Sequence, residues 1–406
     1  MRKTVSKRGF IRSLLPSLRS GDEPLFHGSV RGIDTTLLVL VLLLAAAGTV
    51  TIFSAGFAYA ENRYHNGYYF IERQIVWVVV GVGVMLLSLL PSTRFWFEVA
   101  PSLYLLTILL LLAVLAVGIA GNGAQRWIAL GPLTFQPSEF AKTTLILCLS
   151  RYYADHPAKA FDPKSKKNAF LYGTLFPFLL IGLICVLVLL QKHLSGLIIL
   201  GCIGILVMLF SGITLRYIGA FGGVAGIGVA AFALLTDYTK RRITIWLNPE
   251  QYPLDGGWQT LQGLMAIGSG GFFGRGFGQS VLKYSYVSEP ANDMIYTILC
   301  EETGFIGAAA VVLLFSLFVF RAVRVGSRAA DPFSRLVALG IAGKIAVQVL
   351  LNLAVVTNTI PNTGISLPFF SYGGSSLVML FFEMGILLSI SREVIRNSHR
   401  SLRGGS

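Results

Sequence analysis

Charged residues and cysteines are both scarce in this chain. Only 13% of the 406 residues are Asp, Glu, Lys or Arg, about half the share that soluble domains usually carry. The four cysteines, Cys148, Cys185, Cys202 and Cys300, lie singly within apolar runs, so their spacing matches neither a disulfide framework nor a zinc site. The N-terminus does not have the pattern of a signal peptide, because the first apolar run starts too late and is too long. The scarcity of charge excludes an ordinary soluble domain.

Apolar residues are correspondingly abundant. They make up 54% of the chain and recur in runs of about 20 residues, which is long enough for an α-helix to cross a bilayer. The pattern predicts an all-α, polytopic membrane helical bundle with about ten transmembrane helices. The predicted spans are Thr35–Ala55, Ile75–Leu90, Ser102–Ala120, Phe140–Tyr153, Phe170–Leu190, Leu194–Phe210, Tyr217–Leu235, Asp293–Phe320, Leu336–Thr357 and Leu367–Ile390.

The basic residues are concentrated in four segments. The formal net charge is +14, and Lys and Arg gather in residues 2–19, 151–167, 321–335 and 392–403. With about ten spans, all four segments fall on one side of the membrane, which the positive-inside rule makes the cytoplasmic side. We therefore expect both termini in the cytoplasm and contact with anionic membrane lipids. The same distribution argues against nucleic acid as a partner.

This topology predicts three parts. A basic cytoplasmic tail of residues 1–34 precedes a transmembrane domain of residues 35–392, and a second basic cytoplasmic tail follows in residues 393–406. One extracellular loop, residues 236–292 between the seventh and eighth spans, is far longer than most connections. Loops of that length are usually functional or disordered.

The long loop has a distinctive composition. Residues 262–268 form a candidate amphipathic helix that would lie on the membrane, and Gln259 precedes it. The glycine-rich run Ser269–Ser280 follows and includes Arg275. Its glycines permit positive φ angles and close approach of the backbone to a ligand. A plain flexible loop is the alternative interpretation.

Asp293 follows this loop and opens an apolar run. An ionisable side chain at membrane depth is costly to place there and is a functional candidate by default. Asp is also a favoured N-cap residue, and its charge suits the helix dipole at that position. The residues alone leave both interpretations open, with Asn292 as a second possible cap.

Polar side chains from other spans are expected at the same outer level, since a helix rises about 1.5 Å per residue. Glu139 and Lys142 are three residues apart on one helix face and can form a pair, which is either structural or part of a site. Trp127 is alternatively an interfacial anchor. The candidates for an outward-facing substrate site are Arg126, Trp127, Gln136, Ser138, Glu139, Lys142, Lys192, Ser371 and Tyr372.

Three charged residues lie deeper in the predicted spans. Glu301 and Glu302 are about 12–14 Å below the outer surface by helical rise, and Lys344 lies at a similar depth. Gln348 and Asn352 continue the helix face of Lys344 at i+4 spacing. We predict a buried structural ion pair among these charges, with direct catalysis as the alternative.

Four ordered blocks of this sequence resemble the SEDS family (shape, elongation, division and sporulation; FtsW/RodA/SpoVE-like). The blocks are Gln136–Lys142, Trp258–Ser280, Asn292–Gly304 and Pro361–Ser376. The resemblance covers nearly the whole chain and is closer to the division and sporulation branch than to RodA. It implies ten transmembrane helices with both termini inside the cell.

The resemblance also implies an activity, namely a peptidoglycan glycosyltransferase that polymerises lipid II at the outer face of the bacterial cytoplasmic membrane. Asp293 matches the family's essential aspartate, and a carboxylate there could deprotonate the attacking sugar hydroxyl. Arg126, Lys142 and Arg275 are candidates to stabilise the diphosphate leaving group. The implied partner is a class B penicillin-binding transpeptidase, and the expected location is the division septum.

Some questions stay open at the level of sequence. No carboxylate cluster marks a dedicated metal site, although a divalent cation (Mg²⁺ or Mn²⁺) would suit the diphosphate. Lys192-His193 stands where the family usually has Pro-Asp, so a role carried by that acid is in doubt. A lipid II translocase without polymerase activity is the main alternative function, and a scaffold for the transpeptidase is another.

Overall fold

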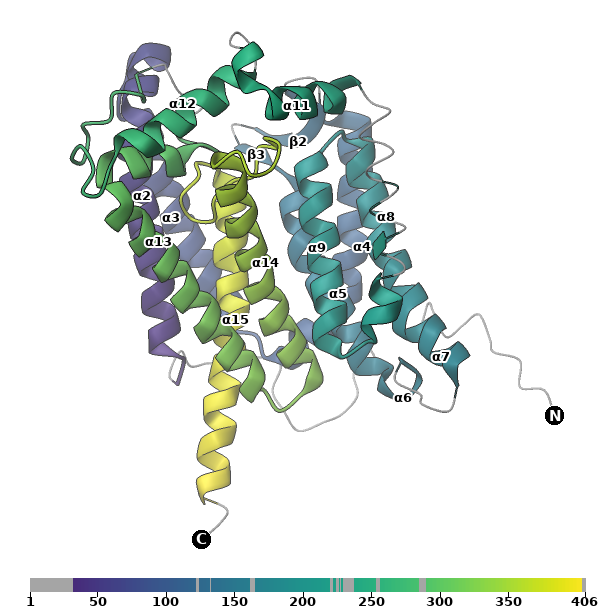
Figure 1. Ribbon diagram of the computed structural model, residues 1–406. Helices are drawn as coiled ribbons and strands as arrows, with labels where there is room; N and C mark the ends of the chain where they lie inside the picture. The colour runs from purple at the N-terminus through teal and green to yellow at the C-terminus, as the bar shows by residue number, and fades with distance from the viewer. Residues whose placement is uncertain are drawn as a thin grey trace, which may run out of the picture.

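The computed structural model describes residues 32–403 except for 122–123, 132, 161–164, 220–221, 224–225, 227, 229–236, 253–255 and 285–289. Long α-helices form a bundle, and a small sheet and two further helices gather at one end of it (Figure 1). Eight described helical segments are long and apolar enough to cross a membrane. The predicted helical membrane bundle is thus confirmed, while the total of ten spans and the sidedness stay predictions.

The first half of the chain supplies helices that run back and forth along the bundle (Figure 1). Asp34 caps the first of them, because its side chain accepts the Leu37 N–H. Pro137 occupies the first turn of α5, where its missing N–H has no cost. The helices are α2 (Thr35–Tyr64), α3 (Tyr69–Leu89), α4 (Thr93–Val117), α5 (Pro137–Asp155), α6 (Pro157–Ala160), α7 (Lys166–Phe170), the π-helical turn η1 (Leu171–Leu175), α8 (Phe176–Leu190) and α9 (Leu194–Ser211).

A three-stranded antiparallel sheet lies between α4 and α5, which the sequence analysis did not predict. Its strands are β1 (Ile119–Gly121), β2 (Ala124–Leu130) and β3 (Leu133–Phe135), in that order. Trp127 pairs with Ile119, and Ile128 pairs with Phe135. The sheet places Arg126 and Trp127 on its central strand at the upper end of the bundle in Figure 1.

The second half of the chain begins with two helices that lie across the upper end of the bundle (Figure 1). They are α11 (Asp237–Leu247) and α12 (Gly256–Ser269), separated by the 3₁₀ turn η2 (Pro249–Gln251). The predicted helix at residues 262–268 falls within α12. The chain then returns to the bundle as α13 (Ile295–Arg328), α14 (Pro332–Val356) and α15 (Gly374–Arg403).

The short predicted span at residues 140–153 is a helix, α5, but it is not among the eight apolar candidates. Most of its side chains are buried, and it packs against α4, α9 and α14. It is therefore an interior helix of the bundle, which explains how it can carry Glu139 and Lys142. Most of the predicted span Tyr217–Leu235 lies outside the described residues, namely 220–221, 224–225, 227 and 229–235.

Two predicted spans begin at residues that lie outside a helix. The last span was expected from Leu367, but α15 begins at Gly374, because Pro368 and Gly373 interrupt the helical backbone before it. The eighth span was expected from Asp293, but α13 begins at Ile295. Both corrections move candidate site residues out of helices and into adjoining loops.

Candidate active site

The loop of residues 357–373 joins α14 to α15 at the upper end of the bundle, and side chains from several elements hold it there. Gln259 on α12 accepts a hydrogen bond from Asn362 at 3.2 Å. The main-chain carbonyls of the loop accept hydrogen bonds from three helices. On α9 the donor is Ser195, and on α11 the donors are Arg242 (2.7 Å) and Trp246 (2.9 Å). On α14 the donors are Gln348 (3.0 Å) and Asn352 (2.7 Å).

The turn that carries Asp293 packs directly against the 357–373 loop. Asn352 donates to the Asp293 carbonyl at 2.9 Å as well as to the loop. The Ser371 hydroxyl donates to the Asn292 carbonyl at 2.7 Å. The Tyr372 main-chain N–H donates to the Ala291 carbonyl at 2.8 Å. Three consecutive carbonyls of the turn are therefore fixed, and with them the backbone position of Asp293.

Asp293 does not occupy the N-cap position of α13. Met294 occupies it, and the Met294 side chain makes no capping hydrogen bond. The structure therefore does not assign Asp293 or Asn292 as the N-cap residue. The Asp293 residue is half-buried, and its Oδ2 lies 3.6 Å from the point where a Cβ on Gly364 would be. Gly364 has φ +69°, so glycine both permits the backbone turn and leaves space beside the carboxylate.

Glu139 and Lys142 form the pair that their spacing predicted. The Lys142 Nζ lies 2.7 Å from the Glu139 carboxylate, and both side chains are almost fully buried at the start of α5. Glu139 also lines a small cavity with Gln348, Ser366 and Ser371. Since Ser371 also bonds to the turn of Asp293, the pair on α5 and that turn both lie next to the same segment of the 357–373 loop.

Arg126 and Lys192 meet through the backbone. The Arg126 guanidinium donates to the Lys192 carbonyl at 2.5 Å. Lys192 has φ +53°, and the residue is exposed. Trp127 and Gln136 are half-buried, and Ser138 is buried with no partner for its hydroxyl among the described residues. These side chains border the same end of the bundle as Asp293.

His193 lies in the turn between α8 and α9, in the position where the family usually has an acid. Burial lowers the pKa of its imidazole to about 3, and the nearby Arg126 guanidinium adds to this shift. Its Nδ1 is buried and has no partner among the described residues. His193 is therefore neutral at physiological pH and does not replace the negative charge of an acid.

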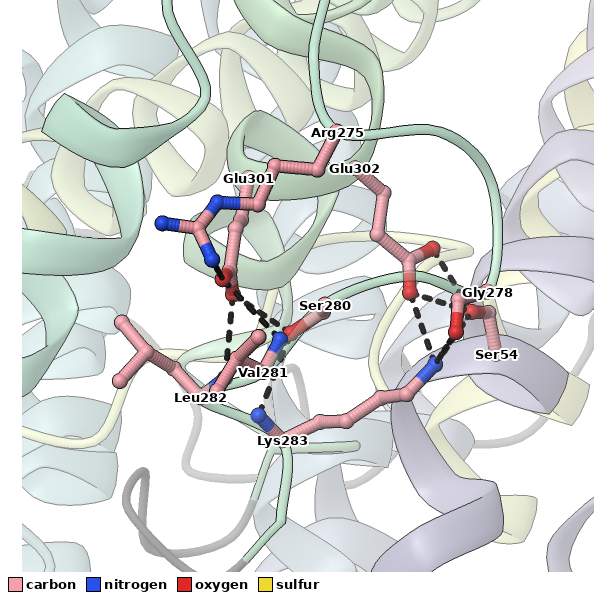
Figure 2. A network of polar contacts seen from close by, with 9 residues as sticks. All are labelled: Ser54, Arg275, Gly278, Ser280, Val281, Leu282, Lys283, Glu301 and Glu302. Carbon is pink, nitrogen blue, oxygen red and sulfur yellow. Dashed lines mark hydrogen bonds and ion pairs between the residues drawn. The ribbon is translucent and has the colours of Figure 1, made fainter.

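Arg275 lies in the glycine-rich loop, which we define as residues 270–284, and its guanidinium faces a buried acid. The Arg275 Nη1 lies 3.6 Å from the Glu301 carboxylate, and the arginine side chain is 42% exposed. Glu301 also accepts from the Ser280 hydroxyl at 2.5 Å (Figure 2). Arg275 thus has an acidic partner inside the protein, which weakens its case as a diphosphate ligand.

The glycine-rich loop approaches a kink in α13 rather than an open ligand site. Gly304 has non-helical angles (φ 65°, ψ −165°) in the middle of α13. The N–H groups of Arg275 and Gly276 donate to the carbonyls of residues 301 and 302, and the carbonyls of residues 271 and 272 accept from the N–H groups of residues 305 and 306. The loop thereby satisfies backbone groups that the kink leaves without helical partners.

The glycines are required by this backbone packing. A Cβ on Gly270 would lie 2.0 Å from the Cys300 carbonyl oxygen, and a Cβ on Gly274 would lie 2.2 Å from that of Glu302. Neither distance is sterically possible. At these two positions, the glycines therefore allow close approach to the backbone of α13 and not, as predicted, to a ligand.

Glu302 is the centre of a second buried contact that joins three segments (Figure 2). The Lys283 Nζ lies 3.0 Å from Glu302 Oε1 and donates to the Gly278 carbonyl at 2.7 Å. The Ser54 hydroxyl on α2 donates to the same carboxylate at 2.6 Å. Glu301 and Glu302 are 0% and 3% exposed, so both acids are buried and fully engaged in holding the loop.

Lys344 does not pair with Glu301 or Glu302. It binds both oxygens of Glu383 on α15, at 2.7 and 2.6 Å, and Thr143 on α5 donates to the same carboxylate at 2.5 Å. The predicted buried charge is present, but its partner was missed. Glu383 is a lone acid in the apolar stretch of the last helix, and that isolation was the signal that could have identified it.

A metal centre is not apparent from side-chain grouping. Among the residues that the structure describes, no three or more His, Cys, Asp or Glu side chains come together. The possible role of a divalent cation stays a prediction.

Comparison with known proteins places the chain in one family. The family described as "Cell cycle protein" (FTSW_RODA_SPOVE) matches residues 34–396. A probable peptidoglycan glycosyltransferase FtsW from Geobacter sulfurreducens is 37% identical over 361 residues, which cover 88% of this chain and 95% of the relative. Stage V sporulation protein E from Bacillus subtilis is 37% identical over 368 residues, which cover 88% of this chain and 97% of the relative.

Solved structures agree. The rod shape-determining protein RodA of Thermus thermophilus superposes with a TM-score of 0.66 and 29% identity, covering 89% of this chain and 98% of that one. A chain from a structure described as "Structural coordination of polymerization and crosslinking by a peptidoglycan synthase complex" gives a TM-score of 0.74 with 29% identity, covering 90% and 99%. This chain belongs to the FtsW/RodA/SpoVE family of polytopic membrane proteins.

Proposed function

We propose that this protein is a peptidoglycan glycosyltransferase that polymerises lipid II into glycan strands. The relatives with 37% identity over most of the chain are named as a probable peptidoglycan glycosyltransferase and a sporulation protein. The single structural observation that supports the proposal is the turn of Asp293. It is clamped by Asn352, Ser371 and Tyr372, which leaves a half-buried carboxylate beside Gly364 at the end of the bundle.

Asp293 is proposed as the general base. In the reaction, the 4-hydroxyl of one sugar forms a bond to the anomeric carbon of another, and the bond from that carbon to the lipid diphosphate breaks. A carboxylate within hydrogen-bond reach takes the hydroxyl proton and typically contributes 10²–10⁴-fold. The fixed backbone suits this role, because a base must be held in place to act on a bound sugar.

The diphosphate leaving group needs positive charge near it. Lys142 and Arg126 are the proposed contacts, with Lys142 held by Glu139 at 2.7 Å and Arg126 positioned by the Lys192 carbonyl. Arginine suits phosphate because its guanidinium can donate two parallel hydrogen bonds. Trp127, Gln136, Ser138, Gln259, Ser371 and Tyr372 are proposed to line the sugar and peptide parts of the site.

The relatives support a proposal for the partner and the location. One similar structure is a peptidoglycan synthase complex that polymerises and crosslinks. We infer that this protein works with a class B penicillin-binding transpeptidase, which would supply the crosslinking. Similarity to FtsW and to the sporulation protein points to the division septum in the bacterial cytoplasmic membrane.

Purified protein in liposomes with labelled lipid II tests the proposal. We expect glycan strands from the wild type and none from Asp293→Asn, while the variant keeps its melting temperature. Transfer of labelled lipid II between leaflets without strand formation, unaffected by Asp293→Asn, would instead identify a translocase. A second assay with added class B transpeptidase should raise the polymerisation rate, and no change would remove the proposed partner.

A further inference from the structure

The end of the bundle opposite Asp293 contains a cavity of about 160 Å³. It lies where α2 begins and where α13 and α15 run out toward their C-terminal ends (Figure 1). Asp34, Ser391 and three arginines of α13 line it, together with the apolar side chains Ile33, Val325, Val394 and Ile395. We call it the basic cavity.

The arginines of the basic cavity lie on one face of α13. Arg321, Arg324 and Arg328 are spaced by three and then four residues, which places their side chains next to one another along the helix. Only Arg328 is in the last turn, where the helix dipole favours a cation. The dipole does not account for Arg321 and Arg324, since its effect fades beyond the last turn.

One arginine is neutralised and two are not. Arg321 binds Asp34, with its Nη2 at 2.8 Å and its Nε at 2.9 Å from Oδ2. Asp34 also accepts from Leu37 and donates its own N–H to Ser391, so its position is fixed. Among the described residues, Arg324 and Arg328 have no acidic partner. Within the part of the chain that the structure describes, the cavity therefore carries two positive charges without an acidic partner.

The rest of the lining fits a lipid rather than a soluble anion. The cavity lies at the end of membrane-spanning helices and combines the arginines with apolar side chains from α13 and α15. A phospholipid presents the same combination, a phosphate next to glycerol and acyl carbons. Basic pockets between helices at the membrane surface bind anionic head groups in this way.

We propose that the basic cavity binds the phosphate group of an anionic phospholipid from the leaflet at that end of the bundle. Arg324 and Arg328 contact the phosphate, and Arg321 is held in place by Asp34 as the third side of the cavity. With Asp293 on the outer side, as proposed above, this is the inner leaflet. The inference about the cavity does not depend on the enzymatic activity.

Retention of lipid by the purified full-length protein tests the proposal. The protein is placed in nanodiscs that contain equal amounts of phosphatidylglycerol and phosphatidylcholine, and the lipids that stay bound after transfer to detergent are counted by native mass spectrometry. Wild type should retain phosphatidylglycerol in preference. Arg324→Gln with Arg328→Gln should lose that preference roughly 30-fold, as expected for two basic contacts to an anionic head group.

A matched control removes the same charge from outside the cavity. Lys167→Gln with Arg335→Gln changes two exposed basic residues that do not line it, and should keep the wild-type preference. Equal losses in both double variants would reduce the effect to general surface charge and overturn the proposal. Displacement of the lipid by millimolar inorganic phosphate would assign the cavity to a free anion and also overturn it.

Discussion

Two regions near the start of α13 use carboxylates in opposite ways. Where the glycine-rich loop packs on α13, Glu301 and Glu302 of that helix are buried and hydrogen-bonded by partners from the loop and from α2. At the turn next to the 357–373 loop, Asp293 is half-buried, and the hydrogen bonds that fix it act on main-chain carbonyls. Within one helix and its preceding turn, acids that look alike in the sequence differ in what surrounds them.

Glu301 and Glu302 therefore stabilise the fold, whereas Asp293 is proposed to take part in the reaction. Substituting a buried acid that has charged and hydrogen-bonded partners destabilises the fold, because the partner is then left unpaired in a medium of low polarity. The hydrogen bonds described for the Asp293 turn act on backbone carbonyls, and the half-buried Asp293 carboxylate is the one that we propose acts on the substrate. We therefore expect changes in the glycine-rich loop to alter stability first, and changes around Asp293 to alter activity first.

Breaking the Lys283–Glu302 pair should have the largest effect on stability. Glu302→Ala leaves Lys283 buried without its carboxylate, and loss of one partner of a buried pair costs about 3–5 kcal/mol. The double variant Glu302→Ala with Lys283→Met should recover most of that loss. Thermal unfolding in detergent measures both.

The control for this pair is Glu98→Gln. Glu98 pairs with Arg94 at 3.2 Å on the helix surface, where both side chains are partly exposed. Loss of such a pair costs under about 1 kcal/mol. If Glu302→Ala were no more costly than Glu98→Gln, the loop would not depend on its buried charges.

Gly274→Ala is the next largest change and tests the backbone contact with the α13 kink. Gly274 and Gly278 have nearly the same positive φ, +78° and +79°. A Cβ on Gly274 would lie 2.2 Å from the Glu302 carbonyl oxygen, whereas a Cβ on Gly278 would have no atom within 4 Å. Gly278→Ala should therefore cost only the roughly 1–2 kcal/mol of a left-handed alanine, and Gly274→Ala clearly more. Equal melting temperatures for the two variants would refute the close packing.

Asn352→Leu should act on the other region and lower activity. The variant removes the hydrogen bonds to the Asp293 carbonyl and to the 357–373 loop, so the base is held less firmly. We expect kcat to fall about tenfold with little change in KM, because misplacement of a catalytic group lowers the rate of the chemical step. Ser389→Ala removes a buried hydrogen bond at the opposite end and should leave kcat unchanged. A similar fall in kcat for both variants, together with lower melting temperatures, would point to general destabilisation.

The smallest expected effect concerns pH and His193. Its folded pKa of about 3 lies below its ordinary value of 6.5. Between these values the unfolded chain binds more protons than the folded one, so stability falls as the pH drops below about 6.5. The residue is only half-buried, so we expect roughly 1 kcal/mol or less between pH 6.5 and 5.5. The melting temperature of His193→Gln should depend less on pH over that range, and parallel curves would contradict the assignment.

The sequence predicted what depends on local pattern. Long apolar runs identified most helices, because a helix in lipid must satisfy its own backbone. The spacing of Glu139 and Lys142 predicted their pair, which forms within one helix turn. The family blocks Asn292–Gly304 and Pro361–Ser376 meet at the Asp293 turn, and Gln259 of a third block contacts the 357–373 loop, whereas the glycine-rich part of that third block packs on α13 instead.

Contacts between helices could not be predicted in the same way. The depth of a residue along its helix does not determine which neighbouring helix its side chain faces. Lys344 was therefore expected near Glu301 and Glu302, but it binds Glu383. The partner of the glycine-rich loop was also hidden, since a glycine run looks the same whether it approaches a ligand or the backbone of α13. The small sheet formed by β1, β2 and β3 was missed because two of its three strands have only three residues each.

The most direct test of the account measures activity and stability together for Asp293→Asn. Initial rates of strand formation from lipid II and the melting temperature are taken on the same preparation, next to wild type. We predict a rate at least about 10²-fold lower with an unchanged melting temperature. A rate equal to wild type, or a loss of rate that simply follows unfolding, would contradict the claim that this carboxylate performs the chemistry.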